Sequence, residues 1–199
     1  MRRVIALLAG SAGFLMFTIA AQCAGTSFAA DDTSDLWDIK QGCQITTNSG
    51  VLASSDIRNM FGGSYGKTEP LPGGYRAIFK DGFSDGYKHW VEWRTSKPIL
   101  LSRFTLYLGN DSPPGAHRSI KEFNLYASQS VGKWGNPVYS RTDFKHPYGP
   151  KDYAMEYTFK KEIAAQYFRA EFIQYDGDPG AQGPRIMELN GYGKVSSGR

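Results

Sequence analysis

The stretch IFKDGFSDGYKHWVEW at residues 78–93 gathers three acidic residues, two Asp-Gly pairs, a histidine and two tryptophans. Four of its residues match positions one, five, six and twelve of the calcium loop of helix-loop-helix proteins: Asp81, Asp85, Gly86 and Glu92. Phe83 stands at position three, where that loop needs an oxygen ligand, and both flanks alternate in the manner of strands. The match to a helix-loop-helix site is therefore accidental.

A serine motif lies just upstream of this stretch. Residues 62–66, GGSYG, fit the G-x-S-x-G pattern, which exposes a nucleophilic serine only where a strand enters and a helix leaves. The residues that follow, KTEPLPGG, cannot form that helix because of their prolines and glycines. Ser64 is therefore not predicted to be catalytic.

The three histidines, His89, His117 and His146, lie in separate segments without the short paired spacing typical of zinc ligands. A carboxylate pair for glycoside hydrolysis stays open, because such a pair is assembled in space. One alternative function is therefore a jelly-roll hydrolase or lyase acting on glycans, with His117, His146 and either Asp111 or Glu92 around one cleft. Beyond that alternative, the sequence identifies no catalytic residue.

The amino-terminal segment predicts export. Arg2 and Arg3 precede an apolar run at residues 4–21, and Ser27-Phe28-Ala29 offers the small residues of a cleavage site. We expect residues 1–29 to be a cleaved signal peptide, which leaves a secreted or periplasmic protein without a membrane span; an uncleaved anchor is the alternative. The remaining chain has 21 basic and 19 acidic residues, a net charge of +2, and no basic cluster that would predict a nucleic-acid partner.

Cys43 is the only cysteine after residue 29, so no internal disulfide is predicted and a buried thiol is expected. A chain of this length forms one good core, which predicts a single domain at residues 30–193 and a short tail at 194–199. The number of copies in solution stays open.

Alternating apolar residues predict an all-β fold. In ILLSRFTLYL, Leu100, Phe104, Leu106 and Leu108 share one face, with Ser102 as the exception. YAMEYTFKK and QYFRAEFIQY repeat the pattern, the latter setting Phe168, Ala170 and Phe172 against Arg169 and Glu171. The one helical turn predicted is at residues 54–60, capped by Ser55 or Asp56. Trp90 and Trp93 lie on opposite faces of a strand, so at most one of them lines a site.

Taken in order, four segments resemble the strands of a discoidin-like domain, the galactose-binding-like jelly roll of coagulation-factor C-type domains. They are AIFKDGFSDGYKHWVEWRTSKPILLSRFTLYL, RSIKEFNLYAS, YFRAEFIQ and GPRIMELNGYG, within residues 77–193. The most specific parts are Asp81-Gly82 before a tryptophan strand and the terminal RIMEL strand. The resemblance implies a jelly-roll β-sandwich of about eight antiparallel strands.

The resemblance also implies a structural calcium ion, held where the Asp-Gly loop meets the last strand. The side chains that it assigns are Asp81, Asp85 and Glu188, and a loop rich in carbonyl and carboxylate oxygens suits calcium. The alternative is that both Asp-Gly pairs only form turns.

Ligand binding in this family uses loops at one end of the sandwich. Three loops offer aromatic and polar side chains suited to a sugar: Asn110, Asp111, His117 and Arg118 in GNDSPPGAHR, Trp134 in SVGKWGN, and His146 and Tyr148 in DFKHPYGP. The predicted function is thus an exported, non-catalytic binding module for a carbohydrate or cell-surface glycan. A structural protein-interaction domain of the cell envelope is the other alternative, favoured if an apolar patch is exposed.

Overall fold

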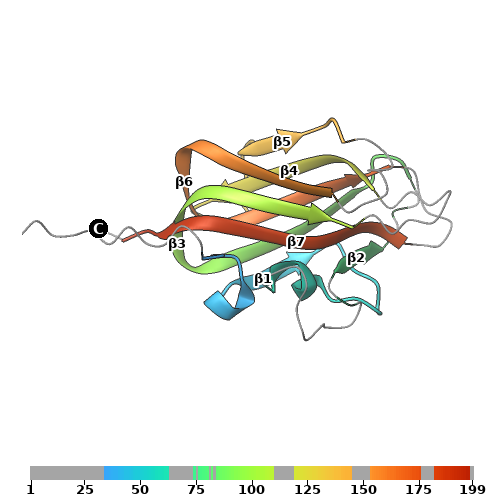
Figure 1. Cartoon of the computed structure of the whole chain (residues 1–199), viewed down its shortest axis with the longest axis horizontal. Coiled ribbons are helices and arrows are strands. Elements are labelled where there is room, and N and C mark those ends of the chain that lie inside the picture. Colours follow the sequence, from blue (N-terminus) through green and yellow to red (C-terminus); the bar gives the residue numbers. More distant parts are fainter. Residues whose placement is uncertain are drawn as a thin grey trace, which may run out of the picture.

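The computed structural model describes residues 34–62, 74, 76–80, 82, 84–109, 119–144, 153–175 and 182–197. Two short 3-10 helices and seven strands make up its secondary structure (Figure 1): η1 Ile39–Gln41, β1 Gln44–Asn48, η2 Ile57–Phe61, β2 Ala77–Lys80, β3 Lys88–Leu108, β4 Ile120–Ser128, β5 Tyr139–Arg141, β6 Tyr153–Gln174 and β7 Gln182–Val195. The predicted all-β class is confirmed.

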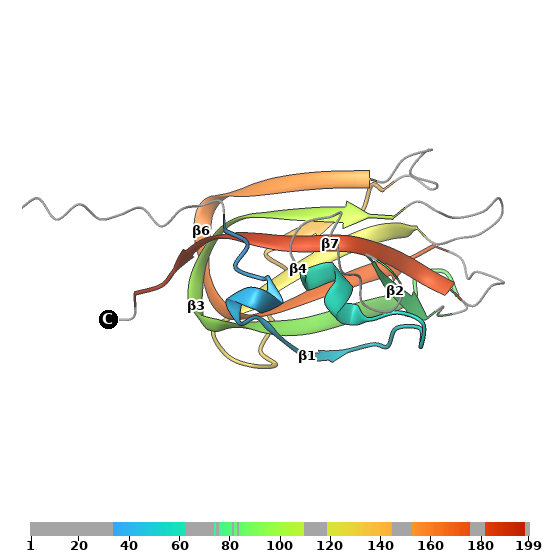
Figure 2. The ribbon, with the colours of Figure 1, turned by 60° about the horizontal axis from the view of Figure 1, so that its bottom comes forward.

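Two very long strands, β3 and β6, build both layers of the sandwich. The hydrogen-bonded order is β2-β7-β3-β6-β4-β5, with β1 added beside β3 and all pairs antiparallel. Because β3 and β6 bend together, this continuous sheet folds onto itself (Figure 2). The first sheet contains β1, β4, β5 and the adjoining halves of β3 and β6; the second contains β2, β7 and the other halves.

The bend in β3 falls at residues 95–98. The register with β6 shifts between Arg94 and Ile99, and the Thr95 hydroxyl donates to the Lys97 carbonyl at 2.6 Å. Pro98 has no N–H to offer a neighbouring strand, so regular pairing is interrupted here. The chain therefore turns from one sheet into the other at this point.

This bend gives the sandwich two different ends. At the end that we call the bend end, β3 and β6 turn over (Figure 2). At the opposite end, which we call the loop end, Leu108 pairs with Tyr153 and Ile120 pairs with Gln174. The segments that connect β3 to β4, β5 to β6 and β6 to β7 all depart from the loop end.

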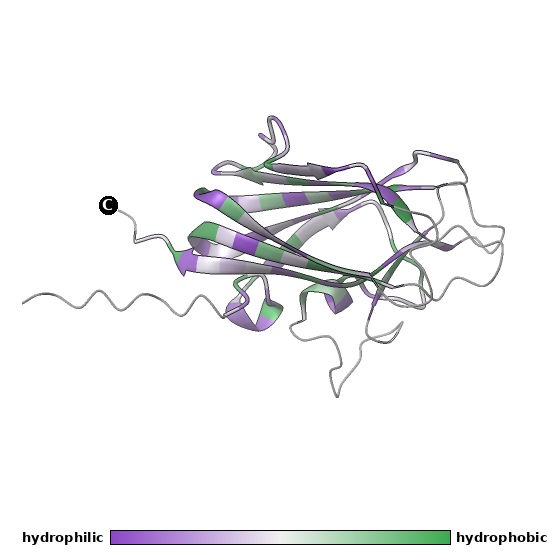
Figure 3. Cartoon of the chain, turned by 45° about the horizontal axis from the view of Figure 1, so that its top comes forward, coloured by the Kyte–Doolittle hydropathy of each residue, from purple (hydrophilic) through white to green (hydrophobic). Residues whose placement is uncertain are grey.

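Aromatic side chains fill the space between the sheets. Trp93 of β3 is completely buried and stacks on Phe168 of β6 with 5.7 Å between ring centroids, and Trp37 meets Trp93 edge-on at 4.9 Å. Apolar and polar residues alternate along the strands, as Figure 3 shows. Trp90 faces outward and is only partly buried, so the prediction that the two tryptophans of β3 face opposite ways is confirmed.

The structure refines several local predictions. In β3 the register shifts between Leu101 and Arg103, so Leu101 is buried in the core and Leu100, predicted to share the face of Phe104, is only partly buried. A β-bulge of this kind reverses the alternation locally, which a strict period of two cannot anticipate.

The predicted helical turn forms as η2, with Asp56 as its cap, whereas η1 was not predicted. Cys43 is buried as a free thiol, as expected. Strand β7 continues to Val195, two residues into the predicted tail, where Lys194 pairs with Glu162 at 2.9 Å.

The predicted signal peptide lies outside the described residues. Within the described ranges, none of the helices has the length and apolar character that crossing a membrane requires.

Candidate functional site

Most of the predicted sugar-binding residues lie outside the described part of the chain: Asn110, Asp111, His117, Arg118, His146 and Tyr148. The strands that flank these residues are described. Residues 110–118 connect β3 to β4, and residues 145–152 connect β5 to β6. Both connections leave from the loop end, where Leu108 pairs with Tyr153. The topology thus brings the bases of these two loops to one end of the sandwich.

Trp134 lies at the other end. Strand β4 runs from Ile120 at the loop end to Ser128, which pairs with Tyr167, and the next residue, Gln129, donates to the Ala164 carbonyl beside the bend. A strand of this length covers about 25 Å. Trp134, partly buried in the β4–β5 connection, therefore does not share a surface with the bases of the other two loops.

The structure does not bring together Asp85 and Glu188, two of the three predicted calcium residues. Asp81 lies outside the described residues, and the Asp85 carboxylate accepts from Lys121 Nζ at 2.7 Å. Glu188 is six residues beyond Gln182, the partner of Lys80 in the β2–β7 ladder, which is about 20 Å along a strand. Side chains that share one calcium ion lie within a few ångströms of each other, so Glu188 does not fit the set predicted with Asp85.

Glu188 instead belongs to a buried polar group on the second sheet. Its side chain is 1% exposed, and it pairs across the sheet with Tyr107. With its amide oxygen facing the Thr105 hydroxyl, Asn190 donates to Glu188 Oε1 at 3.1 Å and to Asp35 Oδ2 at 3.0 Å. Across the described ranges, no three His, Cys, Asp or Glu side chains stand close enough to hold one metal ion.

The enzymatic alternative needs a cleft that contains Glu92 with His117, His146 or Asp111. Glu92 lies on the outer face of the first sheet, where its carboxylate pairs with Arg169 at 2.7 Å. The other three residues are outside the described ranges. The protein-interaction alternative needs an exposed apolar patch, whereas the large exposed apolar residues of the described segments, Tyr87, Val131 and Val195, lie in separate elements.

One exposed aromatic side chain at the loop end was not predicted from the sequence. Tyr87 precedes β3 and keeps 43% of its surface exposed. One side of its ring is fixed by contacts with His89, at 4.9 Å between centroids, and with Gly82, where a Cβ atom would fall 1.9 Å from Tyr87 Cγ. An aromatic ring that is both exposed and held in place is what stacking on a flat apolar ligand face requires.

Gln174, the last residue of β6, holds this loop in shape from inside. Its side chain is fully buried; Oε1 accepts from the Gly82 amide at 3.2 Å and Nε2 donates to the Ser84 carbonyl at 3.2 Å. The same Oε1 lies 2.5 Å from His89 Nε2, so this ring nitrogen carries the hydrogen. The buried side-chain amide of Gln174 therefore fixes the backbone that contacts the Tyr87 ring, in addition to the Asp-Gly turns.

Charged side chains also lie at or near the loop end. The Asp85–Lys121 pair is the nearest of them in sequence, and Lys88 follows on the outer face with its side chain 52% exposed. Deeper in β7, Arg185 is 5% exposed; burial, together with the charge of Arg76, lowers its pKa to about 10. Arg185 therefore still carries its charge near pH 7. The loop end combines a fixed aromatic ring with hydrogen-bonding charges, a chemistry suited to binding hydroxyl-rich ligands.

Neither the Asp-Gly pairs nor the tryptophans of this stretch predicted a binding role for Tyr87. Its only mark in the sequence is its position: an aromatic residue between an Asp-Gly turn and the first polar residue of a strand. Alternation assigns it to the core side of β3 with His89, and only the end of the sandwich leaves its ring uncovered.

No protein-family model and no curated protein sequence matches this chain. Solved structures do match it. The family 32 carbohydrate-binding module of Streptococcus pneumoniae EndoD has a TM-score of 0.55 at 19% identity, covering 81% of this chain and 100% of the module. CBM32-3 from a family 31 glycoside hydrolase of Clostridium perfringens has a TM-score of 0.58 at 15% identity, covering 86% and 98%.

A third match is the f-lectin (fucolectin) from striped bass, Morone saxatilis, serum, with a TM-score of 0.56 at 12% identity; it covers 83% of this chain and 52% of the lectin. Identities this low establish a common architecture, and residue roles do not carry over with it. The prediction from the ordered strands of residues 77–193 is confirmed: this chain has the discoidin-like, galactose-binding-like β-sandwich fold.

Proposed function

We propose that this chain is a non-catalytic carbohydrate-binding module that holds a sugar ring against Tyr87 at the loop end of the sandwich. The observation that carries the proposal is the fixed, exposed ring of Tyr87, at the end of a fold shared with binding modules and a lectin. The apolar face of a pyranose stacks on such a ring, and its hydroxyls bond to nearby charged groups.

The polar partners in this proposal are of two kinds. Lys121 and Asp85 form an exposed ion pair beside Tyr87, and each keeps hydrogen-bonding capacity for a hydroxyl. Asn110, Asp111, His117, Arg118, His146 and Tyr148 are proposed to contribute from the two loops whose bases lie at the same end. We assign Trp134 no part in this site, because its loop leaves from the bend end.

The test is binding of the purified protein to a broad panel of glycans and polysaccharides. Tyr87→Ala is expected to weaken binding about tenfold or more, as truncation of a central aromatic contact does. Trp134→Ala is the matched control, since it removes an aromatic ring at the other end. Loss of binding in Trp134→Ala together with unchanged binding in Tyr87→Ala would reject this location, and a blank panel for the wild type would reject the function.

Calcium is a separate part of the proposal, limited to the loop of Asp81 and Asp85. If the loop holds a calcium ion, chelation lowers the melting temperature, calcium restores it, and Asp85→Ala removes the response. An identical melting temperature with and without chelator would leave Gln174 as the group that fixes this loop.

Export completes the proposal. Residues 1–29 have the composition of a signal peptide, and on that ground we propose that the chain is exported. Amino-terminal sequencing of the protein purified from its source is expected to begin at Ala30. A start at Met1 would contradict cleavage.

A further inference from the structure

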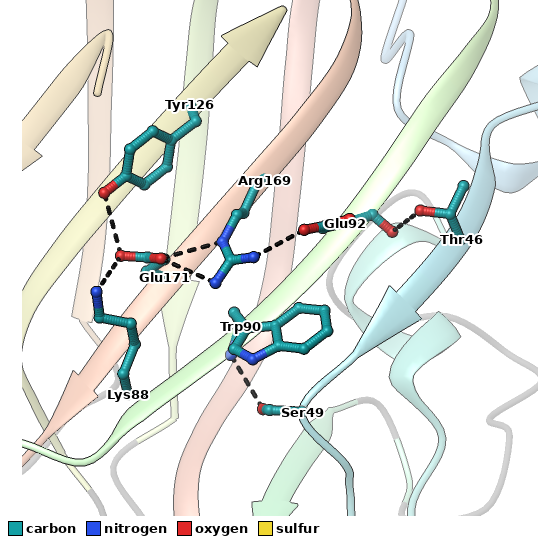
Figure 4. Close-up of polar contacts among 8 residues, drawn as sticks. All are labelled: Thr46, Ser49, Lys88, Trp90, Glu92, Tyr126, Arg169 and Glu171. Carbon is teal, nitrogen blue, oxygen red and sulfur yellow. Dashed lines mark hydrogen bonds and ion pairs between the residues drawn. The ribbon is translucent and has the colours of Figure 1, made fainter. Parts of the chain in front are cut away.

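The outer face of the first sheet carries an array of charged and aromatic side chains that the loop-end site does not use (Figure 4). Trp90 and Glu92 of β3 point away from the core, because their neighbours Val91 and Trp93 are completely buried. Across the ladder Trp90 pairs with Glu171, and Glu92 pairs with Arg169. Alternation thus places two carboxylates, a guanidinium and an indole side by side.

Arg169 lies at the centre of this array. Its Nη1 donates to Glu92 Oε1 at 2.7 Å, its Nε donates to Glu171 Oε1 at 3.0 Å, and its Cζ lies 4.7 Å from the Trp90 ring (Figure 4). A planar guanidinium bound on both sides and stacked on an aromatic ring loses its freedom to rotate. The Trp90 ring is therefore held in one orientation.

Glu171 fixes the other side of the array. Its side chain is 6% exposed, and its second oxygen accepts from Lys88 Nζ at 3.0 Å and from the Tyr126 hydroxyl at 3.1 Å. Burial, together with the charge of Glu171, raises the pKa of Tyr126, so this phenol stays a donor. All of these groups are preorganised before any ligand arrives.

Several hydrogen-bonding atoms around Trp90 remain open. Within the described residues, neither the indole N–H of Trp90 nor Glu92 Oε2 has a protein partner. Lys88 uses one of its ammonium hydrogens for Glu171, and its side chain is 52% exposed. By contrast, the indole N–H groups of Trp37 and Trp93 are sealed in the core. Among the described residues, a partly exposed indole, an open acceptor and open donors lie together around Trp90.

The charges on this face balance. Lys88, Arg94 and Arg169 are set against Glu92, Glu122 and Glu171, so the face has no net attraction for a polyanion or a polycation. A neutral ligand with many hydroxyl groups suits such a face, because its hydroxyls can both donate to the carboxylates and accept from the cations. Tyr126 continues the aromatic surface about 12 Å from Trp90, two strands across and two residues along the ladder. One sugar ring does not span that distance.

We infer that this outer face is a second binding surface, centred on Trp90, for a chain of uncharged sugar residues. The inference rests on the proposed carbohydrate-binding function and adds a site that lies away from the loops. A sugar ring lies against the open edge of Trp90, its hydroxyls donating to Glu92 and accepting from Lys88 and the indole N–H. The next residues of the chain run toward Tyr126.

The experiment compares the full purified chain with three variants on an insoluble neutral polysaccharide to which the wild type binds, and on its soluble oligosaccharides. Trp90→Ala removes the ring, Trp90→Phe keeps the contact with Arg169 but loses the N–H, and Glu92→Gln keeps the shape but changes the acceptor. Lys160→Ala, an exposed change on the first half of β6, is the control. Near-ultraviolet circular dichroism and melting show which variants are folded.

Two outcomes support the inference. Each Trp90 variant that is folded lowers retention on the polysaccharide, with about tenfold loss for Trp90→Ala. Titration with a long oligosaccharide gives two sites per chain for the wild type and one for Trp90→Ala or for Tyr87→Ala. If Trp90→Ala does not fold, Trp90→Phe and Glu92→Gln decide the question, because the first keeps an aromatic ring beside Arg169 and the second is nearly isosteric.

The contrary outcomes are distinct. Trp90→Phe and Glu92→Gln that bind like the wild type, with Tyr87→Ala abolishing all binding, would overturn the second surface and leave the proposed function standing. A wild type that binds no glycan at any chain length would overturn both.

Discussion

Tyr87 occupies the space in which a side chain on residue 82 would stand: a Cβ atom on Gly82 would lie 1.9 Å from Tyr87 Cγ. The ring therefore depends on a glycine five residues before it. The backbone amide of Gly82 in turn donates to Gln174 Oε1. The buried Gln174 side chain, the backbone of Gly82 and the exposed ring of Tyr87 therefore form one structural unit.

Gly82→Ala is expected to displace the Tyr87 ring. Forcing a methyl group into an occupied space typically costs about 1–3 kcal/mol of unfolding free energy, and here the ring can swing into solvent to relieve it. We therefore expect a small loss of stability and a loss of glycan binding similar to that of Tyr87→Ala. Binding by titration calorimetry and unfolding in urea measure the two effects separately.

Gly132→Ala is the control for this change, because its notional Cβ meets no atom within 4 Å; its φ of 72° makes it strained on its own account. It should lower stability without altering binding. Equal loss of binding in both glycine variants would show that general destabilisation, and not the position of Tyr87, is responsible.

Arg169 is expected to stabilise the fold as well as the second binding surface. Arg169→Met keeps much of the side-chain volume but leaves Glu92 and Glu171, with side chains 14% and 6% exposed, without their shared cation. We expect a loss of about 2–3 kcal/mol, below the range for pairs that are wholly buried. Adding Glu92→Gln to Arg169→Met should recover part of this loss, measured as the coupling in a double-mutant cycle. Strict additivity would contradict a mutual interaction.

Cys43 is expected to be inert in the folded protein. Burial, and then the nearby carboxylates of Asp35 and Asp38, raise the pKa of this thiol, so almost no thiolate forms near pH 8. In a Cys23→Ser background, iodoacetamide should modify Cys43 only after unfolding in denaturant. Labelling of the native protein at the rate of a free thiol would show that the segment around η1 opens readily.

How much of this could be predicted from sequence depends on the range of the interaction. Alternation identified Phe168, Ala170 and Phe172 as core, because burial on one face of a strand is a local property. For Arg169 and Glu171, alternation predicted only that they lie on the polar face of the strand. That Glu171 is almost as buried as the core follows from Lys88, Tyr126 and Arg169, which come from three strands and meet only after folding.

The site predictions were limited for a similar reason. The loops of residues 110–118 and 145–152 and the loop of Trp134 have similar compositions, and composition does not tell which end of a sandwich a loop leaves from. The answer comes from the bend at Pro98, which folds β3 back on itself and thereby sets the direction of every later strand. Likewise Glu188 follows a terminal-strand pattern, but the β2–β7 register, which no short motif encodes, separates it from the loop of Asp85.

Low pH is expected to destabilise η2. The side chain of Arg58 donates to Asp56, and this bond, the largest cause, lowers the pKa of Asp56 below its ordinary value of 3.8; the Arg58 backbone amide also donates to it as the helix cap. Because the folded-state pKa lies below that of the unfolded chain, the stabilisation is fully present above about pH 4 and is lost as pH falls through the folded value. Asp56→Asn, which keeps the cap but not the charge, should flatten the fall in stability below pH 4, whereas Asp56→Ala should lower stability at neutral pH by about 0.5–2 kcal/mol. Urea unfolding between pH 2 and pH 7 tests both, and parallel pH profiles for the wild type and Asp56→Asn would show that other carboxylates control acid unfolding.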